Sequence, residues 1–149
     1  MVEATGTAMD ALAIDDFLED QSTGVLAMRA GAGVYALPLS YAFDQGAAAF
    51  YYRLGYGEGS QKRTYVEAAD AATFVVYGPT EEGWKSVVAE GSLESVAETA
   101  IDGSVVQAVE RLHIPFYQLH RRPTSQLEFV MVRLDVEKLS GVAEAVRAT

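Results

Sequence analysis

The sequence predicts a mainly β protein of the α+β class, in which an antiparallel sheet closes, or nearly closes, into a barrel flanked by short helices. Several short runs alternate apolar and polar residues at period two, which is typical of half-buried strands. Short turns containing glycine separate many of these runs. Strands and helices do not alternate regularly, which argues against a doubly wound parallel sheet. The length of 149 residues fits a single domain, 1–149, and no linker or internal repeat divides it.

The first element is predicted to be a short amphipathic helix over residues 10–21. Ile14, Phe17 and Leu18 recur at helical spacing, while acidic residues occupy the other positions. Gly24 follows as a candidate stop signal, because glycine often ends a helix. The helix is therefore expected to lie with its apolar face on a larger element.

Three strands are predicted next, over residues 25–28, 34–43 and 47–53. The middle run carries large apolar residues at period two along its whole length. Turns at 31–33 and 44–46 connect the runs, and both contain glycine. Together these features predict an antiparallel meander.

The remaining elements are read from caps, breakers and periodicity. Ser60 is a favourable N-cap for a short helix, and Gly91 predicts a bulge or bend in the strand that it interrupts. The expected elements are a helix over 60–69, strands over 73–77 and 84–96, a helix over 100–113, a strand over 127–136 and a last helical turn from residue 140.

The charge and composition exclude several classes of function. The chain has 11 basic and 21 acidic residues, a formal net charge of −10, which disfavours binding to nucleic acids or anionic membranes. Cysteine is absent, and no apolar run approaches the length of a membrane span. The first residues lack the features of a signal peptide, so a cytoplasmic protein is expected. Only three lysines occur, so the surface is either salt-adapted or that of an ordinary acidic protein.

No constellation of catalytic or metal-binding side chains stands out. His113 and His120 are spaced too sparsely, without cysteine, to predict a zinc site, and packing or surface roles are expected for them. A Gly-x-Ser-x-Gly nucleophile motif is absent from the sequence. The catalytic residues therefore stay unassigned, and no metal site is predicted.

The segment from Arg53 to Arg63 is the strongest candidate for a binding site. A strand ends at Arg53, a glycine-rich loop over 55–59 follows, and a helix begins with Ser60, Lys62 and Arg63 in its first turn. Helix N-termini and glycine-rich loops favour phosphate groups. A capped helix with a solvated basic turn is an equally weighted alternative. Trp84, Lys85 and Ser86 form a second unusual group, which either borders an aromatic cofactor or marks an edge of the core.

Five segments of the chain, taken in order, resemble the pyridoxamine 5′-phosphate oxidase-like family of FMN-binding split barrels. The similarity is greatest to its small members related to nitroimidazole-resistance proteins. It runs from the first helix to Gly91 and is vaguer beyond. The pieces that carry it are residues 24–27, 36–44, 50–53, 59–62 and 84–91.

The resemblance implies a six-stranded split barrel that forms a homodimer and binds FMN in a groove between the subunits. Gln61 stands where many members carry a second basic residue, which puts the strength of phosphate binding in question. The groups that hold pyridoxamine in the vitamin-making oxidase have no clear counterpart, so that activity is not carried over. The implied flavin contacts are Pro38, Leu39 and Ser40 at the isoalloxazine edge, Tyr52 and Arg53 at the ring and ribityl chain, Ser60, Lys62 and Ser86 at the phosphate, and Trp84 and Lys85 near the flavin.

The expected function is an FMN-dependent oxidoreductase that passes electrons from a reduced nicotinamide to a small organic acceptor. The flavin would supply the redox chemistry, which agrees with the lack of an acid–base constellation. Two alternatives stay open. One is a deazaflavin (F420) or haem-binding split barrel, and the other is a non-enzymatic flavin carrier or ligand-binding module. The aromatic stretch 112–123 is expected to close the core, or else to serve a dimer or a partner.

Overall fold

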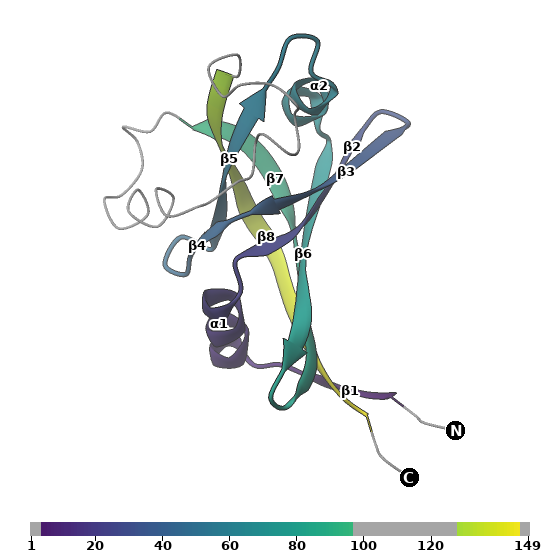
Figure 1. Cartoon of the computed structure of the whole chain (residues 1–149), viewed down its shortest axis with the longest axis vertical. Coiled ribbons are helices and arrows are strands. Elements are labelled where there is room, and N and C mark those ends of the chain that lie inside the picture. Colours follow the sequence, from purple (N-terminus) through teal and green to yellow (C-terminus); the bar gives the residue numbers. More distant parts are fainter. Residues whose placement is uncertain (1–3, 97–127, 147–149) are drawn as a thin grey trace.

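The computed structural model describes residues 4–96 and 128–146, which form strands and two short helices (Figure 1). Every strand pair is antiparallel, so the predicted fold class is confirmed. The elements are β1 (Ala4–Ala8), α1 (Ala11–Asp20), β2 (Thr23–Ala30), β3 (Gly33–Ser40), β4 (Ala42–Asp44), β5 (Ala49–Tyr56), α2 (Gln61–Ala68), β6 (Ala71–Thr80), β7 (Gly83–Val96) and β8 (Glu128–Val146).

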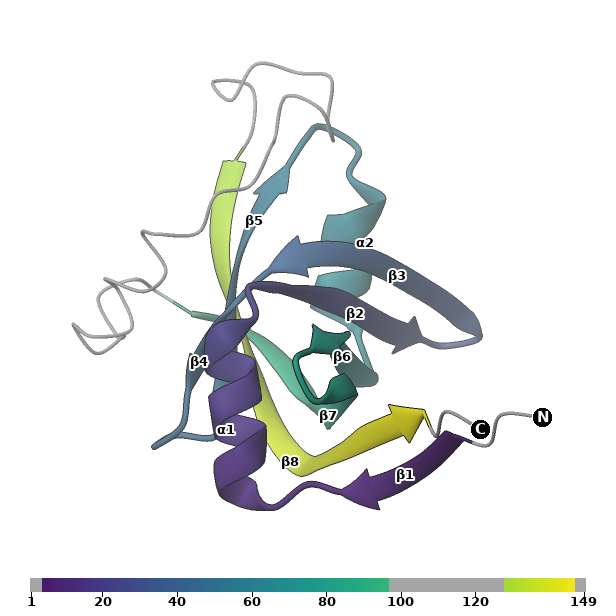
Figure 2. The same ribbon diagram turned by 60° about the horizontal axis from the view of Figure 1, so that its bottom comes forward.

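The described strands form one sheet in the order β3-β2-β6-β7-β8-β5-β4, with β1 beside the end of β8. The two end strands, β3 and β4, are consecutive in the chain and are separated only by Tyr41. The sheet therefore curls back on itself (Figures 1 and 2). The Tyr41 hydroxyl donates to the Leu18 carbonyl at 2.6 Å, and the Tyr41 N–H donates to the Ser22 carbonyl at 3.1 Å. These two bonds fix the corner where β3 ends and β4 begins.

The described residues contain eight strands, where the sequence predicted six over the whole chain. One addition is β1, whose small residues show no apolar alternation. The other arises because the predicted strand 34–43 is broken at Tyr41. The two antiparallel pairings of the predicted meander are present, as β2 with β3 and β4 with β5, but its middle strand is split at Tyr41, so β3 and β5 do not form a ladder.

Two predictions about helices are also corrected. The helix α1 lies between the N-cap Asp10 and the C-cap Gln21, as the periodicity predicted, but Gly24 lies inside β2 rather than serving as the stop signal. The predicted helical turn from residue 140 is wrong, because β8 continues to Val146 between β7 and β1. Strand pairing on both sides outweighs the helix preference of the alanine-rich tail.

The prediction at Gly91 is confirmed, because the register of β7 on β8 shifts between Glu90 and Gly91. A Cβ atom at Gly91 would lie 1.9 Å from the Asp135 carbonyl oxygen, so only glycine permits this approach. The helix predicted over 100–113, both histidines and the aromatic stretch 112–123 lie outside the described residues.

The inside of the curled sheet is an apolar core in which aromatic rings meet edge to face. The Phe74 ring lies at the centre, with its centroid 5.0–5.4 Å from those of Tyr41, Phe50 and Tyr52. The helix α1 adds its buried face to this core. Each fully buried large side chain contributes about 1.5–3 kcal/mol through the hydrophobic effect.

The two ends of the sheet, on either side of the core, carry different elements. Figure 1 shows α2 at the upper end of the sheet, and β1 and the hairpin between β6 and β7 at the lower end. No helix in the described ranges is long and apolar enough to cross a membrane.

Candidate functional site

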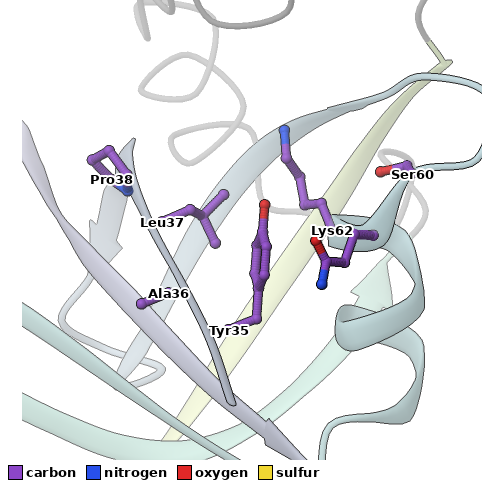
Figure 3. Close-up of a pocket in the computed structure, with 7 residues that line it drawn as sticks. Tyr35, Ala36, Leu37, Pro38, Ser60 and Lys62 are labelled. Atoms are coloured by element: carbon purple, nitrogen blue, oxygen red, sulfur yellow. The ribbon is translucent and has the colours of Figure 1, made fainter. Parts of the chain in front are cut away.

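A pocket of about 360 Å³ lies between β3 and the N-terminus of α2 (Figure 3). One wall comes from four consecutive residues of β3, and the other comes from the start of the helix. Its lining residues are Tyr35, Ala36, Leu37, Pro38, Ser60, Gln61 and Lys62.

The helix wall is formed by a capped N-terminus, as the sequence predicted. The Ser60 hydroxyl oxygen accepts a hydrogen bond from the Arg63 N–H at 3.2 Å, and the Ser60 carbonyl accepts one from the Thr64 N–H at 3.4 Å. A hydroxyl that accepts a bond still has its own proton to donate. The first turn contains no acidic residue. The helix dipole, equivalent to about half a positive charge, is therefore not offset by a carboxylate there.

Lys62 is the one charged residue among the seven described residues that line the pocket. Its ammonium group donates to the Gly55 carbonyl at 3.1 Å, which joins α2 to the end of β5. The side chain is half-buried, and this desolvation lowers the pKa of Lys62. Arg63 is held differently, because its Nε pairs with Glu67 at 3.0 Å and its guanidinium lies 5.7 Å from the Tyr56 ring centroid.

The β3 wall is mostly apolar and belongs to an end strand of the sheet. Leu37 is buried, while Ala36 and Pro38 are exposed. The strand pairs only with β2 among the described strands. About half of its backbone N–H and C=O groups therefore point away from the ladder, as in any edge strand. The wall thus combines apolar side chains with outward-facing backbone groups.

The structure brings three of the predicted binding residues together in this pocket, namely Pro38, Ser60 and Lys62. Leu39 and Ser40 continue β3 beyond Pro38, and both are buried, at 8% and 9% exposure. Neither side chain lines the pocket, so only their backbone groups are placed along the same strand.

Tyr52 and Arg53 do not line the pocket. The Tyr52 side chain is fully buried in the core, where it packs against Phe74. Burial raises the pKa of the Tyr52 phenol. Arg53 is the next residue of β5 and is half-buried on the opposite face of the strand.

Trp84, Lys85 and Ser86 lie at the start of β7, beside the hairpin at the end opposite α2 (Figure 1). Trp84 is 49% exposed and stacks on Tyr77, with the ring centroids 6.4 Å apart. The Lys85 ammonium lies 3.5 Å from the Glu82 carboxylate. Within a single chain, these three residues do not line the pocket.

Sequence reasoning did not assign Tyr35, Ala36 or Leu37 to a site, although all three line the pocket. The period-two pattern treats Tyr35 and Leu37 as core positions, which is correct for Leu37. The pattern carries no information about where α2 packs. Only the position of these residues just before the predicted contact Pro38 could have drawn attention to them.

Among the described residues, no group of three or more histidine, cysteine, aspartate or glutamate side chains could hold a metal ion. The pocket offers hydroxyl, amide and ammonium donors instead. Its chemistry is therefore that of an anion site beside an apolar wall.

Comparison with known protein families gives one match that covers most of the chain. The family described as pyridoxamine 5′-phosphate oxidase matches residues 10–143. The chain belongs to this family. The resemblance seen in the sequence is thereby confirmed, and the matched range includes both walls of the pocket and the start of β7.

Solved structures similar to this family member share its fold at low sequence identity. An FAD-binding protein from Mesorhizobium loti is 21% identical, with a TM-score of 0.71 over 94% of this chain and 98% of its own. A candidate 5-nitroimidazole antibiotic resistance protein from Bacteroides thetaiotaomicron is 9% identical, with a TM-score of 0.71 over 100% and 95%. An FAD and haem-binding protein from Mycobacterium smegmatis is 15% identical, with a TM-score of 0.63 over 97% and 84%. No curated protein matches the chain.

Proposed function

We propose that this protein binds FMN in the pocket between β3 and α2, with the phosphate at the N-terminus of the helix. The observation that carries the proposal is the convergence of Ser60, Lys62 and the first turn of α2 on one side of a single pocket. A phosphate needs several donors and a compensating charge, and these groups supply both. In a chain with a net charge of −10, such a site requires a local arrangement that favours anions.

The opposite wall fits the rest of the cofactor. Leu37 and Pro38 offer apolar surface to an isoalloxazine ring, and the outward-facing backbone of β3 offers hydrogen bonds to its polar edge. The backbone of Leu39 and Ser40 continues this edge. When bound, the flavin supplies the electron-transfer chemistry, while the protein positions it and sets its surroundings.

The activity that we propose is electron transfer from a reduced nicotinamide to a small organic acceptor. Membership of the pyridoxamine 5′-phosphate oxidase family supports a redox role, and similar folds are found in proteins described as FAD-binding. The seven lining residues include no acid–base pair, which suits a site where the cofactor carries the reaction. A deazaflavin with an anionic tail would need more cations than the single lysine that the described part of the chain places in this pocket.

We further propose that two copies of the chain form the complete flavin site. Tyr77, Trp84 and Val142 are 59%, 49% and 37% exposed, and they lie on neighbouring strands as one apolar patch, here named the Trp84 patch. Exposed patches of aromatic and aliphatic side chains commonly mark protein interfaces. Trp84 and Ser86 do not line the pocket of their own chain and lie at the start of β7, at the end of the sheet opposite α2, so a second copy would have to bring them to the flavin, while Lys85 stays paired with Glu82.

The test combines a spectrum, a titration and a mass measurement. Purified protein is expected to be yellow or to take up added FMN, with quenched flavin fluorescence and one flavin per chain. Titrations with FAD and F420 run in parallel, and FMN is expected to bind most tightly. Light scattering is expected to give the mass of a dimer. Protein that is colourless and binds none of the three flavins would overturn the proposal, and tighter binding of FAD or F420 would reassign the cofactor.

A reduced nicotinamide assay then separates an enzyme from a carrier. The flavin-loaded protein is expected to oxidise NADH or NADPH when a small electrophile such as a nitroaromatic is present. Stable flavin binding without turnover on any acceptor would instead favour the carrier.

A further inference from the structure

Tyr35 joins the two walls of the pocket in a way that the strand pattern does not reveal. Its ring projects from β3 and stacks on the Tyr65 ring of α2, with centroids 5.3 Å apart and planes 21° from parallel. Figure 3 shows the Tyr35 ring between Leu37 and Lys62, with its hydroxyl pointing in the same direction as the Lys62 ammonium. The residue is only partly buried, because it lines the pocket.

The partner ring is held in place by close packing on the backbone of β3. A Cβ atom at Gly33 would lie 2.3 Å from the Tyr65 hydroxyl oxygen, so the absence of a side chain there makes room for Tyr65. Because the Tyr65 side chain of α2 packs on β3 at Gly33, its ring offers the Tyr35 ring a fixed face to stack on. The Tyr35 hydroxyl is therefore presented to the pocket by a rigid pair of rings.

The charge of the pocket gives this hydroxyl a role. A phosphate monoester carries nearly two negative charges at neutral pH and has three terminal oxygens that accept hydrogen bonds. The described lining residues include one cation, Lys62, so the phosphate oxygens that it does not reach need neutral donors. The Tyr35 phenol is such a donor on the β3 wall, facing Ser60 and Lys62 on the other.

We propose that Tyr35 is a phosphate-recognition residue, whose hydroxyl donates to a terminal phosphate oxygen and distinguishes phosphorylated flavins from riboflavin. This inference rests on the proposed function. It adds that the phosphate is held from both walls of the pocket, rather than by the start of α2 alone. A hydrogen bond from a neutral donor to a charged acceptor is stronger than one between neutral groups.

The test compares two single-atom changes, Tyr35→Phe and Tyr65→Phe, in the full chain. Tyr35→Phe keeps the stacked ring and removes the pocket hydroxyl, whereas Tyr65→Phe keeps the stack and removes a hydroxyl that faces Gly33. Fluorescence titrations with FMN and with riboflavin measure the two dissociation constants. Tyr35→Phe is expected to raise the dissociation constant for FMN about tenfold and to leave that for riboflavin unchanged. Tyr65→Phe is expected to change neither.

Each other outcome is decisive. Unchanged FMN binding in Tyr35→Phe would overturn the inference while leaving the proposed function intact. Equal weakening of FMN and riboflavin would also overturn it, because Tyr35 would then contact the ring system rather than the phosphate. If the unmodified protein binds neither flavin, the proposed function itself fails and Tyr35 has no phosphate to recognise. Thermal unfolding of both variants, expected to match the unmodified protein within a few degrees, checks that they are folded.

Discussion

Lys62 and Lys85 lie at opposite ends of this barrel, and the contrast between them shows how neighbouring groups determine whether a lysine can bind an anion. At the α2 end, Lys62 lines a pocket whose seven described lining residues include no acid, at the start of a helix without an acidic first turn. At the hairpin end, Lys85 pairs with Glu82 in a groove of about 680 Å³. The acidic residues that line this second groove are Asp16, Asp20, Glu81 and Glu82.

In the sequence the two lysines have similar neighbours, since each lies near a serine and a large aromatic residue. The fold separates them, because the hairpin between β6 and β7 brings Lys85 against the acidic face of α1. Among the described residues, the pocket at the α2 end is lined by a lysine and no acid, whereas the groove at the hairpin end is lined by a lysine and four acids, so the α2 end is the one expected to hold a phosphate.

Lys62→Met is expected to weaken FMN binding by about 1.5–3 kcal/mol, because a charge-assisted bond to the phosphate is lost. Lys85→Met removes the same charge at the other end and is expected to change FMN binding by less than about 0.5 kcal/mol, as for an exposed ion pair. Fluorescence titration of both variants at one ionic strength measures the difference. Equal losses would show that the two ends act on one ligand, which requires a second copy to bring Lys85 to the flavin.

Trp84→Ser is expected to destabilise the dimer by about 2 kcal/mol, as for a large aromatic residue at the centre of an interface. Leu12→Ser is the matched control, since Leu12 is 70% exposed on α1 and lies outside the Trp84 patch. Light scattering over a dilution series gives the dissociation constant of each variant. A dimer unaffected by Trp84→Ser would place the interface elsewhere on the chain.

Sequence reasoning predicted those parts of the fold and site that depend on neighbours in the chain. The Ser60 cap and the bulge at Gly91 are both confirmed, since a helix start and a strand interruption are set within a few residues. Lys62 and Pro38 could be grouped only through the family resemblance. Their distance in the sequence gives no sign that they share a pocket.

The features that were missed depend on contacts between distant residues. No glycine or proline stands at the break between β3 and β4 to predict it. Tyr41 occupies the break, and its hydroxyl donates to the carbonyl of Leu18, 23 residues earlier. The strand β1 consists of small residues and is defined by pairing with the end of β8. Tyr35 obeys the strand alternation, and its place on a pocket wall arises only because Tyr65 packs on it from α2.

Ser60→Ala tests the two helix starts against each other. Both helices have a capping side chain, because Asp10 Oδ1 accepts from the Ala13 N–H at 2.8 Å as Ser60 accepts from Arg63. Each alanine variant is expected to lower the free energy of unfolding by about 1 kcal/mol in denaturant titrations. Only Ser60→Ala is expected to weaken FMN binding, by several-fold. If Asp10→Ala weakened it as much, the effect of Ser60 would be one of general stability.

The smallest expected effect is a pH dependence of FMN binding that belongs to Lys62. Burial lowers the pKa of this ammonium below its ordinary value of 10.5, so the charged form is disfavoured in the folded protein. As the pH rises through the lowered pKa, Lys62 loses its proton before an exposed lysine would, and the phosphate loses its counter-charge. The sign for stability is opposite, since the penalty of the buried charge is present at low pH and is relieved as the pH rises towards 10.5.

The FMN dissociation constant is therefore expected to rise on the alkaline side at a lower pH than an unperturbed lysine would give. Lys62→Arg should keep its charge throughout and hold the affinity flat over the same range, because guanidinium groups stay protonated. Titrating both proteins with FMN at each pH cancels the ionisation of the flavin itself. Identical pH profiles for the two would mean that the ammonium of Lys62 is not the charge that the phosphate meets, and that its bond to the Gly55 carbonyl serves to join α2 to the end of β5.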